Sequence, residues 1–201
     1  CWSLVGSEMC IRDRNDTVRG ANKSLFSEGD TAETANNGGG YLSAFVTDGF
    51  SVTSGSSGDD AVNDGTGTYV GWNWKAGGTP TANNSESSGD VPTAGSVKID
   101  GVNLATGLQG SLPATRLSAN TKAGFSIVTY TGNNSDGATV AHGLTQKLDA
   151  LFIKKRADNS SSGNTGYWIG QHVALTTDPE GDEHSFTSVS YTHLRAHETP
   201  A

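Results

Sequence analysis

Short runs of β-branched and aromatic residues, separated by glycine, asparagine, aspartate and serine, form the hydrophobic pattern of this chain. The clearest runs are residues 41–46 (YLSAFV), 49–53 (GFSVT), 69–74 (YVGWNW), 124–131 (GFSIVTYT) and 166–173 (GYWIGQHV). Apolar runs of this length, bounded by turn residues, are typical of β-strands. Few stretches have helical spacing, so the pattern predicts an all-β sandwich or barrel.

Two of the apolar runs carry further predictions. In residues 69–74, strand alternation places Val70, Trp72 and Trp74 on one face, which we expect to be buried. Residues 148–155 (LDALFIKK) fit both helical spacing and a buried strand, because short apolar runs do not distinguish the two by period alone. We expect a strand there.

The middle of the chain lacks a sustained period. Residues 76–96 are rich in Gly, Thr, Ser, Asn and Pro, which is typical of a flexible linker. Residues 97–117 contain leucines at near-helical spacing, but Gly107 and Gly110 interrupt them and Pro113 ends them. We therefore expect a loosely ordered arm rather than a helix.

The two ends of the chain differ in kind from its interior. Residues 4–14 (LVGSEMCIRDR) and 189–199 (VSYTHLRAHET) resemble translations of the two strands of one sequencing adapter. Codons can be chosen for the second peptide so that their reverse complement encodes most of the first. We expect the biological sequence to run from about Asn15 to about Ser188. Both cysteines lie outside that range, so the interior has neither a disulfide nor a thiolate metal site.

Composition excludes several functional classes. The 201 residues are 33% hydrophobic with 27 glycines, and the formal net charge is -8. An acidic chain without a basic stripe argues against nucleic-acid binding, and no apolar run approaches the roughly 20 residues of a membrane helix. The chain has no phosphate loop, HExxH or GxSxG motif, so we expect no enzyme, no catalytic residue, no metal ion and no cofactor.

Candidate chemistry is confined to a few side chains. Asp178, Glu180 and Asp182 alternate like calcium ligands, but later ligands are missing, and we interpret them as a solvated turn. His142 is interpreted as a turn histidine with a backbone hydrogen bond.

Four aromatic residues are candidates for carbohydrate contact, because flat aromatic faces stack on sugar rings: Trp72, Trp74, Tyr167 and Trp168. The alternative is that these residues belong to the core. Exposed, coplanar tryptophans would favour sugar binding, and buried ones would favour a scaffold.

Four segments together resemble a known family: residues 16–25 (DTVRGANKSL), 69–78 (YVGWNWKAGG), 120–134 (NTKAGFSIVTYTGNN) and 139–144 (TVAHGL). The family is a β-rich domain of unknown function that recurs in structural and tail-fibre-like proteins of marine bacteriophages. The resemblance implies a concanavalin-like or jelly-roll-type antiparallel sandwich and brings no catalytic residues. In such proteins the segment like 120–134 opens a repeat and the segment like 69–78 closes one.

That order predicts a division into five parts: 1–14 artefact, 15–78 closing half of one repeat, 79–118 linker and arm, 119–188 opening half of the next, and 189–201 artefact. We expect the two halves to complement each other by strand pairing within one sandwich. The resemblance implies a non-enzymatic virion component, part of a tail fibre or surface appendage, with other virion subunits or repeats as partners. The alternative is a carbohydrate-binding module with a bacterial surface glycan as its partner.

Overall fold

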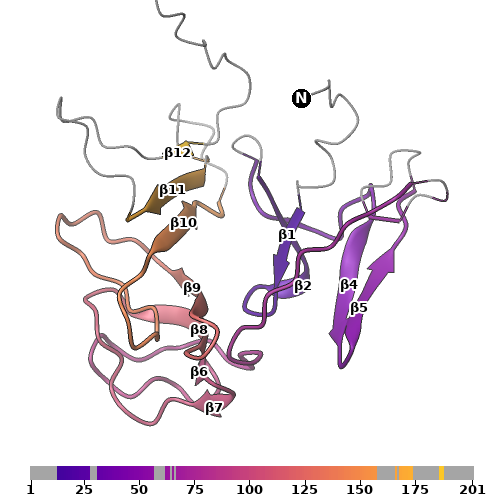
Figure 1. Ribbon diagram of the computed structural model, residues 1–201. Helices are drawn as coiled ribbons and strands as arrows, with labels where there is room; N and C mark the ends of the chain where they lie inside the picture. Colours follow the sequence, from indigo (N-terminus) through magenta and orange to yellow (C-terminus); the bar gives the residue numbers. More distant parts are fainter. Residues whose placement is uncertain are drawn as a thin grey trace, which may run out of the picture. The chain divides into compact units, whose positions relative to one another are not determined.

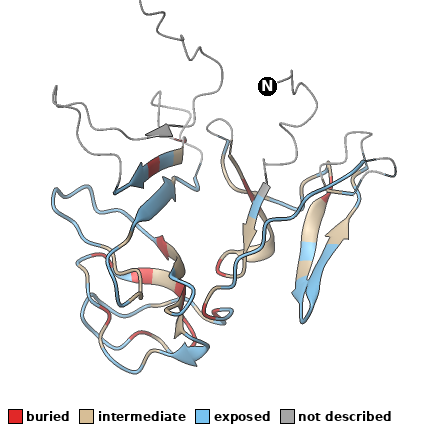
Figure 2. Cartoon of the chain, in the orientation of Figure 1, coloured by how far each residue is buried: buried red, intermediate tan, exposed pale blue. Residues whose placement is uncertain are grey.

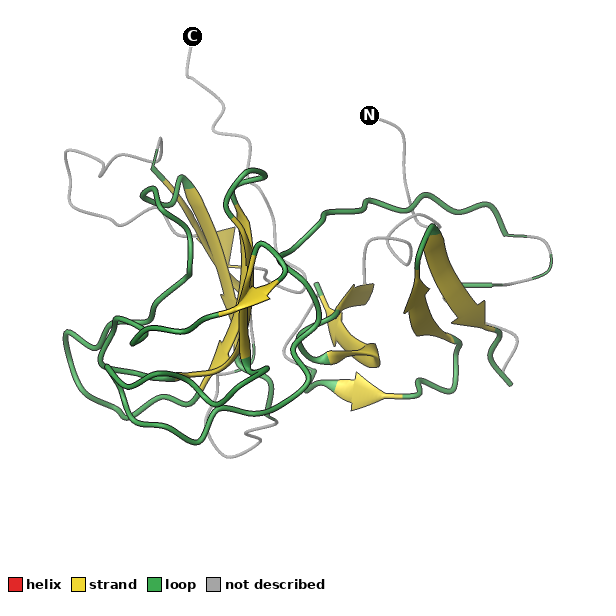
Figure 3. Ribbon diagram, turned by 90° about the horizontal axis from the view of Figure 1, so that it is seen from below, coloured by secondary structure: helices red, strands yellow, loops and turns green. Residues whose placement is uncertain are grey.

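The computed structural model describes residues 13–27, 31–56, 62–63, 65, 67–157, 166, 168–173 and 186–187, and this part consists of strands and loops without a helix (Figure 3). The expected all-β class is confirmed, whereas the sandwich remains a prediction. The strands, labelled in Figure 1, are β1 (Asp13–Asp16), β2 (Gly20–Phe26), β3 (Thr34–Ala35), β4 (Tyr41–Val46), β5 (Gly49–Thr53), β6 (Val97–Ile99), β7 (Val102–Asn103), β8 (Ala114–Asn120), β9 (Phe125–Tyr130), β10 (Ala150–Lys154), β11 (Trp168–His172) and β12 (Phe186–Thr187). No helix in the described residues is long and apolar enough to cross a membrane.

The chain divides into two compact units. The first unit comprises the chain up to Arg14, residues 24–34 and the chain from Leu148 onward, and the second comprises residues 15–23 and 35–147. The sheet β10-β11-β12 belongs to the first unit, and the sheets β4-β5 and β7-β6-β8-β9 belong to the second. A further three-stranded sheet has the order β1-β2-β3.

The four-stranded sheet β7-β6-β8-β9 carries the main hydrophobic core of the second unit (Figure 2). β6 runs parallel to β8, with Val97 opposite Leu117, while β7 and β9 pair antiparallel at the two edges. Buried residues of the core are Val97, Leu108, Ala114, Leu117 and Ala119. The expectation of a loosely ordered arm over residues 97–117 is therefore wrong: Val97, Leu108 and Leu117 from this stretch join one core, although Val102 is exposed.

A tight hairpin joins β6 to β7. Ile99 lies opposite Val102, and the intervening Asp100 and Gly101 have φ angles of 51° and 88°. Two successive positive φ angles are characteristic of the type I′ turn, for which Asp-Gly is a favoured pair. The Asp-Gly pair between Ile99 and Val102 is thus the signal in the sequence that predicts this hairpin.

The glycine-rich stretch before β6 is a loop, as its composition predicted, and hydrogen bonds connect it to β8. Asn84 donates from its backbone N–H to Thr115 at 2.9 Å and from Nδ2 to Ala114 at 3.1 Å. Its Oδ1 accepts from the Thr93 N–H at 3.0 Å. Polar composition indicated a loop correctly, but one asparagine with several backbone partners fixes that loop against β8.

The segment at residues 148–155 forms a strand, as expected. β10 pairs antiparallel with β11, and Phe152 lies opposite Gly170. The strand is not buried, however: Leu151, Phe152 and Ile153 are all exposed. Its apolar run indicated extended backbone correctly, but burial also requires a covering layer on each face.

The two expected half-repeats do not share strand pairing. Among the described strands, none from residues 15–78 pairs with one from 119–188. β9 instead pairs with β8, most of which lies in the expected arm. The connection between these strands is only residues 121–124, and a short loop costs less closure entropy than a distant partner. The hypothesis of complementary pairing is therefore wrong for the described strands.

Candidate functional site

The segment around Trp72 and Trp74, predicted as a strand, is a loop that belongs to none of the strands of the structure. Val70, Trp72 and Trp74 are 65%, 75% and 61% exposed, so the expectation of a buried strand face is wrong. Alternation determines which side chains share a side of the backbone, but burial requires a neighbouring layer. No described strand pairs with this segment.

Three aromatic rings form a continuous group, which we call the aromatic surface: Trp72, Trp74 and Phe125. The ring centroids of Trp72 and Trp74 are 6.4 Å apart and their planes are inclined by 40°. Trp74 stacks on Phe125 at 6.1 Å with 19° between the planes. The two tryptophans are therefore exposed but not coplanar, and the third ring supports Trp74 from the first residue of β9.

Hydrogen bonds anchor the glycine-rich end of this segment on the four-stranded sheet. The Gly77 carbonyl accepts from the Gly101 N–H at 2.7 Å, and the Gly78 carbonyl accepts from Ser118 Oγ at 2.6 Å. Asn120 donates from Nδ2 to the Lys75 carbonyl at 3.2 Å. These bonds place Trp74 beside Phe125 although the two residues are far apart in the sequence.

The close approach of the backbone here requires glycine at position 77. A Cβ atom added to Gly77 would lie 1.9 Å from the carbonyl oxygen of Ala119 in β8, well inside contact distance. The pair Gly77-Gly78 in the motif YVGWNWKAGG therefore has a packing reason as well as a turn-like composition.

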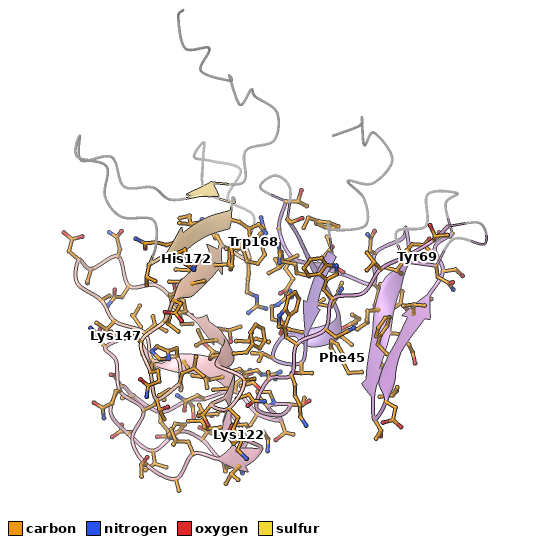
Figure 4. The ribbon with its side chains drawn as sticks, in the orientation of Figure 1. Phe45, Tyr69, Lys122, Lys147, Trp168 and His172 are labelled. Atoms are coloured by element: carbon orange, nitrogen blue, oxygen red, sulfur yellow. The ribbon has the colours of Figure 1, made fainter. Side chains whose placement is uncertain are left out.

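The surface beside the tryptophans is a shallow, open hollow. It is lined by Val70, Gly71, Trp72, Asn73 and Trp74. Figure 4 draws the side chains and labels Tyr69, which begins the segment 69–74, and Phe45 on β4. Most of the exposed lining is apolar, and Asn73 supplies a polar side chain that donates to the Gly71 carbonyl at 3.3 Å. Such a surface suits the face of a flat, partly apolar ligand.

Trp168 has a different environment, in the first unit. Its indole Nε1 donates to the Phe26 carbonyl at 2.6 Å, which ties β11 to β2. Arg14 lies over the ring with Cζ 5.0 Å from the centroid, and burial lowers the pKa of this guanidinium. Within the first unit, the Trp168 indole is thus held by a hydrogen bond to Phe26 and covered by the Arg14 guanidinium.

The remaining candidates contribute little to a site. Tyr167 and the acidic residues Asp178, Glu180 and Asp182 lie outside the described residues. His142 Nδ1 accepts from the Leu144 N–H at 3.1 Å, which confirms the predicted backbone hydrogen bond. In the part of the chain that the structure describes, no three His, Cys, Asp or Glu side chains are grouped as metal ligands would be.

The site therefore consists of Trp72 and Trp74, which the sequence indicated, and Phe125, which it did not single out. Phe125 is the first residue of the predicted strand at 124–131, and its alternation suggested only a sheet face. Its contact with Trp74 depends on a tertiary arrangement, so no local signal identifies it.

The described fold and this surface define an all-β protein that presents a pair of exposed tryptophans on a glycine-rich segment. A family model matches two stretches of the chain, residues 2–107 and 100–190, and its description is a domain of unknown function, DUF7483. The chain belongs to this family. Neither the curated proteins nor the solved structures contain a significant match.

Proposed function

We propose that this chain is a non-enzymatic structural domain of a phage virion appendage, of the tail-fibre type, and that it contacts host-surface saccharide through Trp72 and Trp74. The observation that carries the saccharide contact is the exposure of these two tryptophans, 75% and 61%, on a segment anchored to the four-stranded sheet. Exposing two indoles to water is unfavourable unless a ligand or partner covers them, and indole faces suit the apolar face of a pyranose.

Support for the appendage comes from the family resemblance. The segments at 69–78 and 120–134 resemble the closing and opening strands of repeats in tail-fibre-like proteins. The two family matches, which overlap only at residues 100–107, agree with parts of successive repeats in one chain. The resemblance brings no catalytic residues, which is why the proposal is non-enzymatic.

Saccharide binding is tested on an array of bacterial surface polysaccharides, with the 201-residue protein labelled at a site away from the second unit. We expect at least one polysaccharide to bind and to quench or shift the tryptophan fluorescence. The variants Trp72→Ala and Trp74→Ala should each weaken this binding by roughly tenfold, because an aromatic contact in an interface contributes on the order of 1–2 kcal/mol.

Trp168→Phe provides the matched control, because Trp168 lies in the first unit and its indole N–H is bonded to Phe26. This variant should bind the same polysaccharide as tightly as the wild type. If the wild type binds no polysaccharide, or if the Trp72 and Trp74 variants bind as well as the Trp168 variant, saccharide contact at this surface is excluded.

A further inference from the structure

Lysines gather where the aromatic surface meets the four-stranded sheet. Lys75 directly follows Trp74, and its carbonyl accepts from the Asn120 side chain. Lys122 lies two residues after Asn120 and three before Phe125, and both Lys75 and Lys122 are exposed. In β6, the Lys98 side chain crosses Gly78, since its Cδ lies 3.4 Å from the position of an added Cβ at that glycine.

This local charge opposes that of the chain. The whole sequence has 21 acidic and 13 basic side chains, yet residues 67–78 and 118–131, which carry the aromatic surface, contain Lys75 and Lys122 and no acidic residue. The net negative charge of the protein repels an anionic ligand at long range. A local cluster of lysines can offset this repulsion and attract the anion to one part of the surface.

A carboxylate of the described residues lies near Lys122. Asp100, in the β6–β7 turn, accepts from the Thr121 N–H at 2.8 Å and from Thr121 Oγ1 at 2.5 Å. These bonds, together with the charge of Lys122, lower the pKa of Asp100, so the carboxylate is ionised at neutral pH. Its oxygens are engaged with Thr121, and among the described residues of 67–78, β6 and the β6–β7 and β8–β9 turns, Lys75, Lys98 and Lys122 outnumber this aspartate.

We infer that the saccharide bound at the aromatic surface is anionic, a polymer that carries carboxylate or sulfate groups, with Lys75 and Lys122 contacting those groups while the rings of Trp72 and Trp74 cover a sugar face. This inference rests on the proposed function and adds the class of ligand. Aromatic stacking alone accepts neutral and acidic sugars alike, whereas flanking ammonium groups favour the acidic ones.

The test compares acidic bacterial polysaccharides with their own carboxyl-reduced or desulfated forms, printed side by side and probed with the 201-residue protein. We expect the acidic form to bind at least about tenfold more tightly than its neutralised form at low salt, and the difference to shrink at high salt as exposed charges are screened. The double variant Lys75→Ala/Lys122→Ala should lose roughly tenfold in affinity for the acidic forms only. Lys147→Ala, an exposed lysine outside the cluster, is the charge-matched control and should bind like the wild type.

The outcomes separate the two proposals. The anionic specificity is overturned if acidic and neutralised forms bind equally, or if the double lysine variant keeps the salt dependence of the wild type. In either case, binding by Trp72→Ala still tests the aromatic contact. Loss of preference in the lysine variant with retained binding to neutral forms supports both proposals. Absence of binding to every polysaccharide overturns both.

Discussion

Single polar side chains fix the loops of the second unit by bonding to backbone groups. Asn120 accepts from the Ala123 N–H at 3.0 Å through Oδ1 while donating to Lys75 through Nδ2, so one residue closes the β8–β9 turn and holds the tryptophan segment. Asn84 acts similarly on the loop before β6, and Asp100 on the loop after β8. Short side chains of this type compete well for local backbone donors, which explains their abundance in a chain rich in loops.

Asp100 provides a prediction at this scale. The backbone of Asp100 has a φ of 51°, which Asp and Asn adopt more readily than alanine does. Asp and Asn also have a side-chain oxygen that accepts from the Thr121 N–H, and alanine has none. We expect Asp100→Ala to lower the midpoint of thermal unfolding, measured by circular dichroism, more than Asp100→Asn does.

The same residue predicts a pH dependence. Hydrogen bonds from the Thr121 side chain and backbone hold the pKa of Asp100 below its ordinary value. A lowered folded-state pKa stabilises the fold above the ordinary pKa, and this contribution is lost as the pH falls through the lowered value. Above the ordinary pKa of an aspartate, the wild type should be more stable to thermal unfolding than Asp100→Asn. This difference in stability should disappear as the pH falls through the lowered pKa of Asp100. If the wild type stays more stable than Asp100→Asn at a pH below that lowered pKa, the ionised carboxylate does not have this role.

At the scale of elements, the strands are built from neighbouring sequence, whereas the tryptophan segment is placed by distant contacts. β4 and β5 form a hairpin, as do β6 and β7, and β8 pairs with β9 across a short loop. Residues 75–78 instead contact β8 and the β6–β7 turn through backbone groups of Lys75, Gly77 and Gly78. The aromatic surface thus depends on the contact between this segment and the sheet.

Gly77→Ala tests that dependence. The added methyl would overlap the Ala119 carbonyl, so we expect a loss of roughly 1–3 kcal/mol in the free energy of unfolding and a change in Trp74 fluorescence as the segment moves from Phe125. The control is Gly132→Ala, because a Cβ there meets nothing within 4 Å. Equal stability and spectra for the two variants in urea titrations would show that the segment is not packed as described.

At the scale of the whole molecule, many large apolar side chains are exposed in both units. They include Phe45, Phe50, Trp72 and Trp74 in the second unit and Phe152 and Ile169 in the first. Exposed apolar groups of this extent are typical of interaction surfaces, and an isolated two-stranded hairpin such as β4-β5 is marginally stable alone. We therefore expect other chains to cover some of these exposed side chains.

Self-association is the expected consequence. In sedimentation velocity over a range of concentrations, the wild type should show a weight-average sedimentation coefficient that rises with concentration. Phe152→Ser, which removes a 64% exposed aromatic ring from β10, should reduce that rise, whereas Lys147→Ala should leave it unchanged. A concentration-independent monomer for the wild type would contradict the prediction.

The sequence by itself determined the all-β class and several strand positions, because alternation and turn residues act within a few positions of each other. Examples are residues 41–46, 49–53 and 148–155. The Asp100-Gly101 pair is a similarly local sequence signal, in this case for a hairpin turn. Only the tertiary structure decided which faces are covered. Val70, Trp72 and Trp74 alternate like a core strand yet are exposed, while Val97, Leu108 and Leu117, which follow no sustained period, lie in the core. Burial depends on which distant segments lie alongside, and neither composition nor period contains that information.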